Sequence, residues 1–136
     1  MGLGTDNVFR IGGWSASDNA FRMDGSGNLT MLGNVTGADF IISSDARYKN
    51  VFGNIPNALT AVNSLNGVTY TYNELSGKDT DTVRAGVLAQ EVEKVLPQAV
   101  YTDADGYKSV SYDGLVPLLI EAIKELTTRV EELENK

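Results

Sequence analysis

The chain has 136 residues, a hydrophobic fraction of 42% and a formal net charge of -7 at pH 7. This length and composition suit one compact domain or two small ones with an apolar core. The eleven basic residues are scattered, so nucleic acid is not an expected partner. Apolar runs fall short of the roughly twenty residues that a membrane helix needs, and no membrane partner is expected.

The sequence contains neither cysteine nor histidine. Their absence removes disulfides, thiol nucleophiles, the commonest general base and the commonest zinc ligand. A serine nucleophile in this chain would therefore need another base, and lysine is the known variant. No cofactor or metal is expected, because the acidic turn Asp103–Gly106 lacks the further carboxylates of a calcium-binding loop.

Residues 1–43 are rich in glycine and asparagine and contain two internal echoes. Phe9–Gly12 is echoed by Phe21–Gly25, and Gly27–Thr30 recurs as Gly33–Thr36. This pattern predicts short strands separated by turns. A segment of about forty residues with such strands buries too little to fold alone, so we expect it to be completed by oligomerisation or stacking.

Longer elements are predicted after residue 44. In chain order they are a helix over 56–65, strands over 68–72 and 83–88 joined by a loop over 73–81, a helix over 89–96, and a hairpin of 99–102 with 107–112. Pro97 is expected to stop the second helix, because proline lacks the N–H group that an interior helical residue donates.

The last helix is predicted over residues 115–135, with Asp113 as its N-cap. Its apolar residues follow heptad spacing, with Val116, Ile123 and Val130 at a positions and Leu119, Leu126 and Leu133 at d positions. Arg129 at g and Glu134 at the following e are placed to pair between parallel chains. β-branched a residues with leucine at d favour a dimer. The alternative is an amphipathic helix that packs on its own domain.

The segment Ser44-Asp45-Ala46-Arg47-Tyr48-Lys49 places a hydroxyl five residues before a lysine amine. For Lys49 to act as a base its amine must be partly neutral, and burial together with a nearby cation such as Arg47 would favour the neutral form. Serine and lysine at this spacing are common, so the spacing alone indicates an ordinary loop.

This segment resembles the opening signature of the phage tail-spike and tail-fibre intramolecular chaperone domain, the peptidase S74 type of endosialidases and appendage proteins. Gly86–Pro97 is similar to the second block of that family. Ser109–Leu115, followed by Ile120–Leu126, is similar to the third. The three blocks stand in the family's order and span about residues 44–136.

The resemblance implies an α+β fold with two parts. Residues 1–43 would be the end of a β-rich fibre or spike, and residues 44–136 a mixed α/β chaperone ending in the long helix. The chaperone would help its client, the upstream fibre polypeptide, to form an intertwined homotrimer. This trimer opposes the dimer that the heptad residues favour, and we expect the fibre segments to set the stoichiometry.

The resemblance also implies a single-turnover serine autoprotease that acts only on its own chain. The scissile bond would be Ser43–Ser44, with Ser44 as nucleophile and Lys49 as base. Candidate supporting residues are Asp45, Arg47, Gln90 and Glu91. The protein would be made in the host cytoplasm, with the mature fibre part in the virion and the chaperone part released.

Three alternatives stay open at this point. The chaperone could remain attached as a trimerisation module that does not cut. The chain could be a receptor-binding fibre tip with no chaperone. A membrane-tethered transcription factor of animals uses the same cleaving domain, but its upstream part would carry a DNA-binding domain in place of fibre-like repeats.

Overall fold

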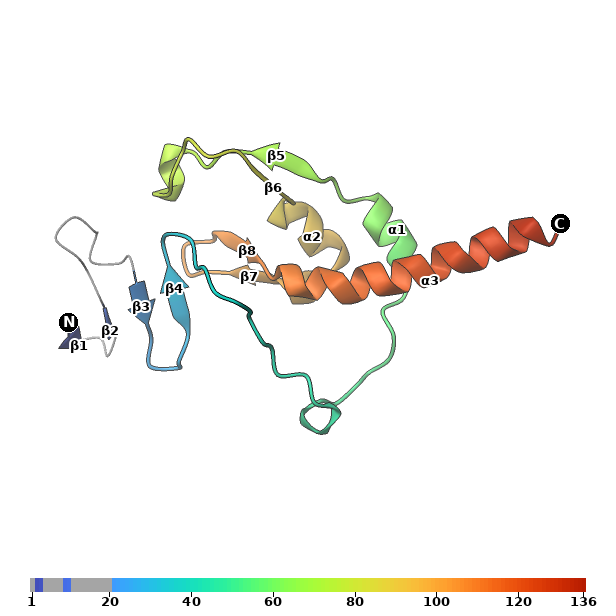
Figure 1. Ribbon diagram of the computed structural model, residues 1–136, viewed down its shortest axis with the longest axis horizontal. Helices are drawn as coiled ribbons and strands as arrows, with labels where there is room; N and C mark the ends of the chain where they lie inside the picture. The colour runs from blue at the N-terminus through green and yellow to red at the C-terminus, as the bar shows by residue number, and fades with distance from the viewer. Residues whose placement is uncertain (1, 4–8, 11–20) are drawn as a thin grey trace. The chain divides into compact units, whose positions relative to one another are not determined.

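The computed structural model describes residues 2–3, 9–10 and 21–136 (Figure 1). The chain divides into two compact units. Unit 1 comprises residues 1–44 and 71–83, and unit 2 comprises residues 45–70 and 84–136. The N-terminal segment and one internal loop thus form the first unit, while the α-helices found among the described residues belong to the second.

Unit 1 contains a four-stranded antiparallel sheet in chain order. Its strands are β1 (Gly2–Leu3), β2 (Phe9–Arg10), β3 (Phe21–Met23) and β4 (Leu29–Met31). The first echo brings its two copies onto neighbouring strands, with Phe9 opposite Met23 and Arg10 opposite Arg22. Residues 11–12 of that echo lie outside the described residues. The predicted short strands are confirmed for this pair of segments.

The second echo forms a strand only in its first copy, so this prediction is wrong for Val35 and Thr36. The physical reason lies in Asp24, whose carboxylate accepts hydrogen bonds from the backbone of Ser26 and Asn28 at 2.9 Å each. It also accepts one from the Asn28 side chain at 3.0 Å, the main cause of a lowered Asp24 pKa. These bonds close the β3–β4 turn. A second such turn six residues later would need an aspartate at position 30, where the sequence has Thr30.

Unit 2 combines three α-helices with two antiparallel strand pairs. In chain order its elements are α1 (Ala58–Asn63), β5 (Val68–Tyr70), β6 (Arg84–Gly86), α2 (Ala89–Val95), β7 (Val100–Thr102), β8 (Lys108–Val110) and α3 (Leu115–Glu134). Each corresponds to a predicted element and is slightly shorter. The mixed α/β class with a long C-terminal helix is therefore confirmed.

The core of unit 2 lies where the three helices meet. It is made of small and branched apolar side chains, namely Ala58, Leu59, Val92, Leu96, Ala99, Leu118 and Ala122. Helix α1 packs against α3 near the middle of its length, and the C-terminal part of α3 extends beyond it (Figure 1). Every residue from Leu126 to Lys136 is exposed. The C-terminal part of α3 thus takes no part in the core.

A tyrosine hydroxyl joins the second and third sequence blocks. The hydroxyl of Tyr112 accepts a hydrogen bond from the backbone N–H of Val87 at 3.0 Å. A Cβ atom at Gly86 would collide with this hydroxyl and lie 3.1 Å from a ring carbon of Tyr70. Glycine at this position therefore allows the phenol to reach the backbone. The contact ties β6 to the turn that leads into α3.

The start of α3 differs from the prediction. The N-cap is Gly114, which makes no side-chain capping bond, and Asp113 lies inside a preceding 3-10 turn over Tyr112–Gly114. That turn runs directly into the helix, with the backbone N–H of Leu115 donating to Asp113 and Tyr112. A continuous helical turn leaves no extended residue for side-chain capping, so Asp113 as N-cap is wrong.

Helix α1 is capped by a side chain from α3. Its own N-cap residue, Asn57, has a left-handed backbone (φ 53) and makes no capping bond. The carboxylate of Glu125 instead accepts hydrogen bonds from the backbone N–H of Ala58 at 3.1 Å and of Leu59 at 2.6 Å. Two of the N–H groups that every helix leaves unpaired are thereby satisfied. Glu125 also attracts the positive end of the helix dipole.

Helix α3 has two apolar faces, and its own unit covers one of them. Leu118 and Ala122 are buried, with exposures of 1% and 4%. The six residues predicted at a and d positions are all exposed, from 45% at Val130 to 67% at Leu133. The helix does pack on its own domain, but through the other face. The heptad face therefore points away from the core of unit 2.

Candidate functional site

The motif that begins at Ser44 folds into a single 3-10 turn over Ala46–Tyr48. The backbone N–H of Tyr48 donates to the carbonyl of Asp45 at 3.0 Å, and that of Lys49 donates to Ala46 at 3.1 Å. The Asp45 side chain caps the turn, because its Oδ1 accepts from the backbone N–H of Arg47 at 2.9 Å. Aspartate is well suited to this position, because its short carboxylate can accept a hydrogen bond from the backbone N–H two residues later.

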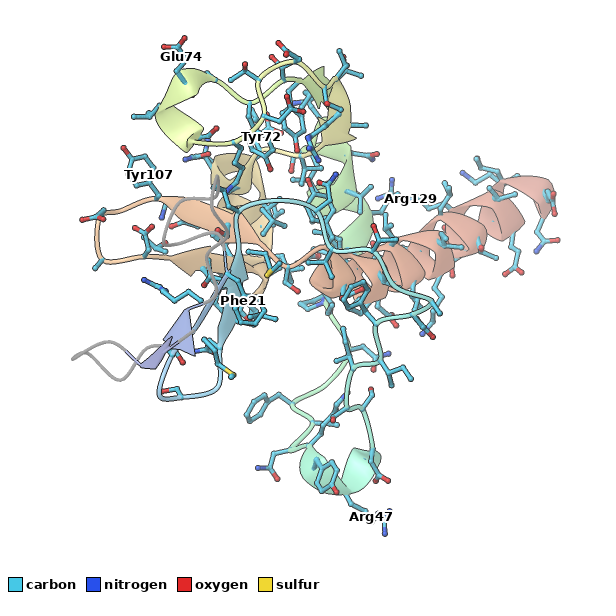
Figure 2. The ribbon with its side chains drawn as sticks, turned by 60° about the vertical axis from the view of Figure 1, so that its left-hand side comes forward. Phe21, Arg47, Tyr72, Glu74, Tyr107 and Arg129 are labelled. Carbon is cyan, nitrogen blue, oxygen red and sulfur yellow. The ribbon has the colours of Figure 1, made fainter. Side chains whose placement is uncertain are left out.

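The same carboxylate forms a two-point ion pair with the guanidinium of Arg47. Nε of Arg47 donates to Oδ1 at 3.0 Å and Nη2 donates to Oδ2 at 2.9 Å. These side-chain bonds, followed by the backbone bond, lower the pKa of Asp45, and the carboxylate raises the pKa of Arg47. Figure 2 shows Arg47 at the tip of the loop that carries the turn. The carboxylate and the guanidinium at the tip of this loop are thus held in a fixed relative orientation by two hydrogen bonds.

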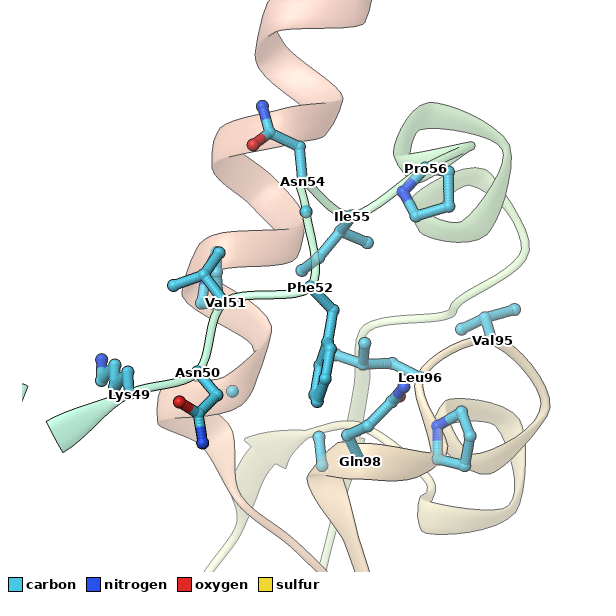
Figure 3. A pocket seen from close by; sticks show the side chains of 15 residues that line it. Lys49, Asn50, Val51, Phe52, Asn54, Ile55, Pro56, Val95, Leu96 and Gln98 are labelled. Carbon is cyan, nitrogen blue, oxygen red and sulfur yellow. The ribbon is translucent and has the colours of Figure 1, made fainter. Parts of the chain in front are cut away.

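Lys49 follows the turn in extended backbone and lines a groove of about 780 Å³. The other lining residues are Asn50–Pro56 from the same loop, Val95–Ala99 from the end of α2, Gly114 and Pro117. Among all these lining residues, Lys49 alone is charged. Figure 3 shows Lys49 at one end of the groove and the ring of Phe52 pointing toward Leu96 and Gln98.

The two predicted catalytic residues fall in different units of the chain. Ser44 ends the first segment of unit 1, and Lys49 belongs to unit 2. The pairing of these side chains therefore stays a prediction. Lys49 is exposed, and the charge of Arg47 is offset by Asp45.

The other predicted supporting residues lie in the first turn of α2. Glu91 accepts hydrogen bonds from the backbone N–H of Asn66 at 3.1 Å and from its side chain at 3.0 Å. It thereby fastens the loop after α1 to α2. Gln90 is exposed, and neither residue lines the groove of Lys49. A role for either residue in cleavage stays a prediction.

The apolar side chains that surround this motif were not among the residues predicted for the site. Tyr48, Val51 and Phe52 are exposed, and Phe52 is fully so. The available signal was their presence in a loop without helical or strand periodicity. Clusters of exposed apolar side chains are typical of interaction surfaces.

The comparison with protein families identifies the segment that contains this motif. Residues 44–101 match the model of a family described as chaperone of endosialidase. This match confirms the resemblance of the segment to the peptidase S74 family.

The chain is also similar to long tail fibre proteins of bacteriophages. It is 39% identical over 127 residues to Gp37 of Enterobacteria phage T2, covering 90% of this chain and 9% of that protein. It is 41% identical over 115 residues to Gp37 of Enterobacteria phage K3, covering 82% of this chain and 9% of that protein. It is 32% identical over 139 residues to Gp37 of Salmonella phage S16, covering 93% of this chain and 18% of that protein. The chain thus spans a small fraction of each of these relatives.

Within the part of the chain that the structure describes, no helix combines the length and the apolar character needed to cross a bilayer.

Proposed function

We propose that this chain is the end of a phage tail fibre joined to a chaperone that trimerises the fibre and then cuts itself off. The family match over residues 44–101 and the tail fibre names of the similar proteins support this role. The mature fibre part, residues 1–43, would stay in the virion. Residues 44–136 would be released after synthesis and assembly in the host cytoplasm.

The heptad face of α3 is the observation that carries the proposed association of copies, while the number of three copies comes from the family resemblance. Within the described residues, seven apolar side chains are buried while twenty-three large ones are exposed. Six of the exposed side chains are the a and d residues of α3. A bundle of such helices buries this seam against its copies. We infer that three copies of the chain join along α3 in parallel.

Exposed apolar residues also stand on both sides of the proposed cleavage bond. Phe40, Ile41 and Ile42 precede it, and Tyr48, Val51 and Phe52 follow it. In a trimer these side chains would be covered by neighbouring chains, and the amine of Lys49 would lose water with them. Burial favours the neutral amine. Assembly would then switch on the base, and cleavage would report a completed trimer.

The proposed reaction needs no captured substrate. The Ser44 hydroxyl attacks the carbonyl carbon of Ser43 and gives its proton to Lys49, which returns a proton to the departing amide nitrogen of Ser44. Water then hydrolyses the resulting ester. Proximity lowers the barrier, since nucleophile and carbonyl belong to adjacent residues. A single cut with a half-time of roughly ten minutes requires a barrier of about 21 to 22 kcal/mol, a modest demand.

The second candidate is a trimerisation module that stays attached. Two observations favour it: Lys49 is exposed in the single chain, and the neighbouring Arg47 is paired with Asp45. The two candidates share the same assembly and differ only in the fate of the Ser43–Ser44 bond.

Intact mass measurement and N-terminal sequencing of the purified protein separate the two candidates. We expect a new N-terminus at Ser44 that disappears in Ser44→Ala and in Lys49→Ala, while both variants remain trimeric. Ser43→Ala and Lys136→Ala are the matched controls and should still be cut. A wild-type chain that stays at full length while folded and trimeric rejects self-cleavage in favour of the attached module.

A further inference from the structure

Helix α1 has six residues and is held near both ends by carboxylates from the other helices of unit 2. At its start, Glu125 of α3 accepts from the backbone N–H groups of Ala58 and Leu59. Beyond its end, Glu91 of α2 accepts from the backbone N–H of Asn66 at 3.1 Å and from its side-chain Nδ2 at 3.0 Å. A helix this short is not stable by itself, so these long-range contacts help to keep α1 in the core.

Asn66 is the only asparagine in the sequence that is followed by glycine. Asparagine is most prone to deamidation before glycine, because a residue without a side chain lets its backbone nitrogen approach the asparagine carbonyl. Asn66 and Gly67 are both exposed and lie between α1 and β5. No atom of the described residues lies within 4 Å of a Cβ atom built at Gly67. The pair is therefore open to the water that the reaction needs.

We propose that Asn66 is a deamidation site that Glu91 keeps unreactive in the folded chain. In this reaction the backbone nitrogen of Gly67 loses its proton and attacks the side-chain carbonyl carbon of Asn66, whose Nδ2 leaves as ammonia. Water then opens the resulting succinimide ring to aspartate or isoaspartate. Ring closure changes the backbone and side-chain torsions of Asn66, and the two bonds to Glu91 hold both. Those bonds must therefore open first.

The product reverses the sign of the contact with Glu91. Deamidation replaces an amide that donates to Glu91 by a carboxylate, which has no hydrogen to donate and repels the carboxylate of Glu91. The loop after α1 is then pushed away from α2. Because the ammonia is lost, the step is irreversible. Unit 2 thus contains an ageing step at one end of α1, whether or not the chain cuts itself.

Peptide mapping of the full chain, aged at mildly alkaline pH, measures the rate at which Asn66 is converted. Glu91→Ala should deamidate about tenfold faster than the wild type, because the two bonds no longer need to open. Glu93→Ala is the matched control and should age at the wild-type rate, since it removes a carboxylate of the same helix that pairs with Lys108. Equal rates in the wild type and Glu91→Ala, both folded by circular dichroism, overturn the inference. If Glu91→Ala does not fold, Glu91→Gln, which keeps one acceptor oxygen, decides the outcome in the same way.

Thermal melting tests the reversal of sign. Asn66→Asp reproduces the product, whereas Asn66→Ala removes the side-chain bond without adding a charge. Asn66→Asp should melt lower than Asn66→Ala at neutral pH. The difference should vanish in a Glu91→Gln background, and also below about pH 4, where repelling carboxylates take up protons and their destabilisation is lost. Identical melting temperatures at neutral pH would contradict the repulsion and the loosening of α1.

Discussion

The two apolar faces of α3 differ in what covers them. The inner face carries Leu118 and Ala122, which are buried against α1 and the end of α2. The outer face carries the heptad residues from Val116 to Leu133, all exposed. One helix therefore serves the core of unit 2 with one face and leaves the other available for association. We therefore expect that substitutions can separate the folding of unit 2 from the assembly of copies.

The largest effect is expected from charges on the outer face. Ile123→Asp combined with Leu126→Asp should abolish the proposed trimer, because a bundle core cannot hold unpaired carboxylates. Sedimentation velocity should then show a monomer whose circular dichroism retains the helices of unit 2. Cleavage should be lost as well, if neighbouring chains complete the site.

Thr128→Asp is the matched control, since it adds a charge to the same helix away from the heptad face. It should remain trimeric. A doubly charged variant that still sediments as a trimer contradicts the role of the outer face. A monomer that is cut at the normal rate contradicts only the coupling of cleavage to assembly.

The inner face should determine the stability of unit 2. In the monomeric background, Leu118→Ala should lower the free energy of unfolding by about 3 kcal/mol, because it opens a cavity among buried side chains. Urea unfolding followed by circular dichroism measures the change. Leu119→Ala makes the same substitution one residue later on the outer face and should cost under about 1 kcal/mol. Equal costs for the two variants would break the distinction between the faces.

A smaller effect is expected at Glu125, which caps α1 from the inner side of α3. Glu125→Ala should cost about 1 kcal/mol in unfolding free energy, because two N–H groups of α1 lose their acceptor. Thermal melting of the monomeric background provides the measurement. Glu132→Ala, an exposed position further along the helix, is the control, and an identical melting temperature for both variants would rule out the capping role.

The smallest effect should come from the proposed ion pairs at the rim of the helix bundle. Arg129→Gln and Glu134→Gln should each weaken the trimer by a few tenths of a kcal/mol, because exposed ion pairs contribute little. A double-mutant cycle on trimer dissociation measures their coupling. Strictly additive effects would show that Arg129 and Glu134 do not meet between chains.

Much of the local structure could be predicted from the sequence. The helix over 89–96 and the hairpin around Asp103–Gly106 are marked by periodicity, proline and glycine within a few residues. In the hairpin, Asp103 accepts from the backbone of Asp105 and Tyr107 at 2.9 Å each. Such bonds connect near neighbours, so the sequence pattern records them.

The long-range contacts could not be predicted in the same way. Glu125 caps a helix whose first residues lie 66 and 67 positions earlier, and Glu91 holds Asn66 across 25 positions. No periodicity records such a partnership. At the candidate site, the residues of the motif came from resemblance. An ion pair of Asp45 with Arg47 was one interpretation of the sequence, and the structure shows its two-point geometry.

The heptad spacing of the last helix and the family block that opens at Ser44–Lys49 can both be recognised without a structure. Which face of α3 the core of unit 2 uses depends on tertiary packing. Periodicity specifies which residues share a face, but burial depends on the elements that pack against that face. Leu118 and Ala122 are buried in the core of unit 2. The heptad face is exposed because no other described segment covers it.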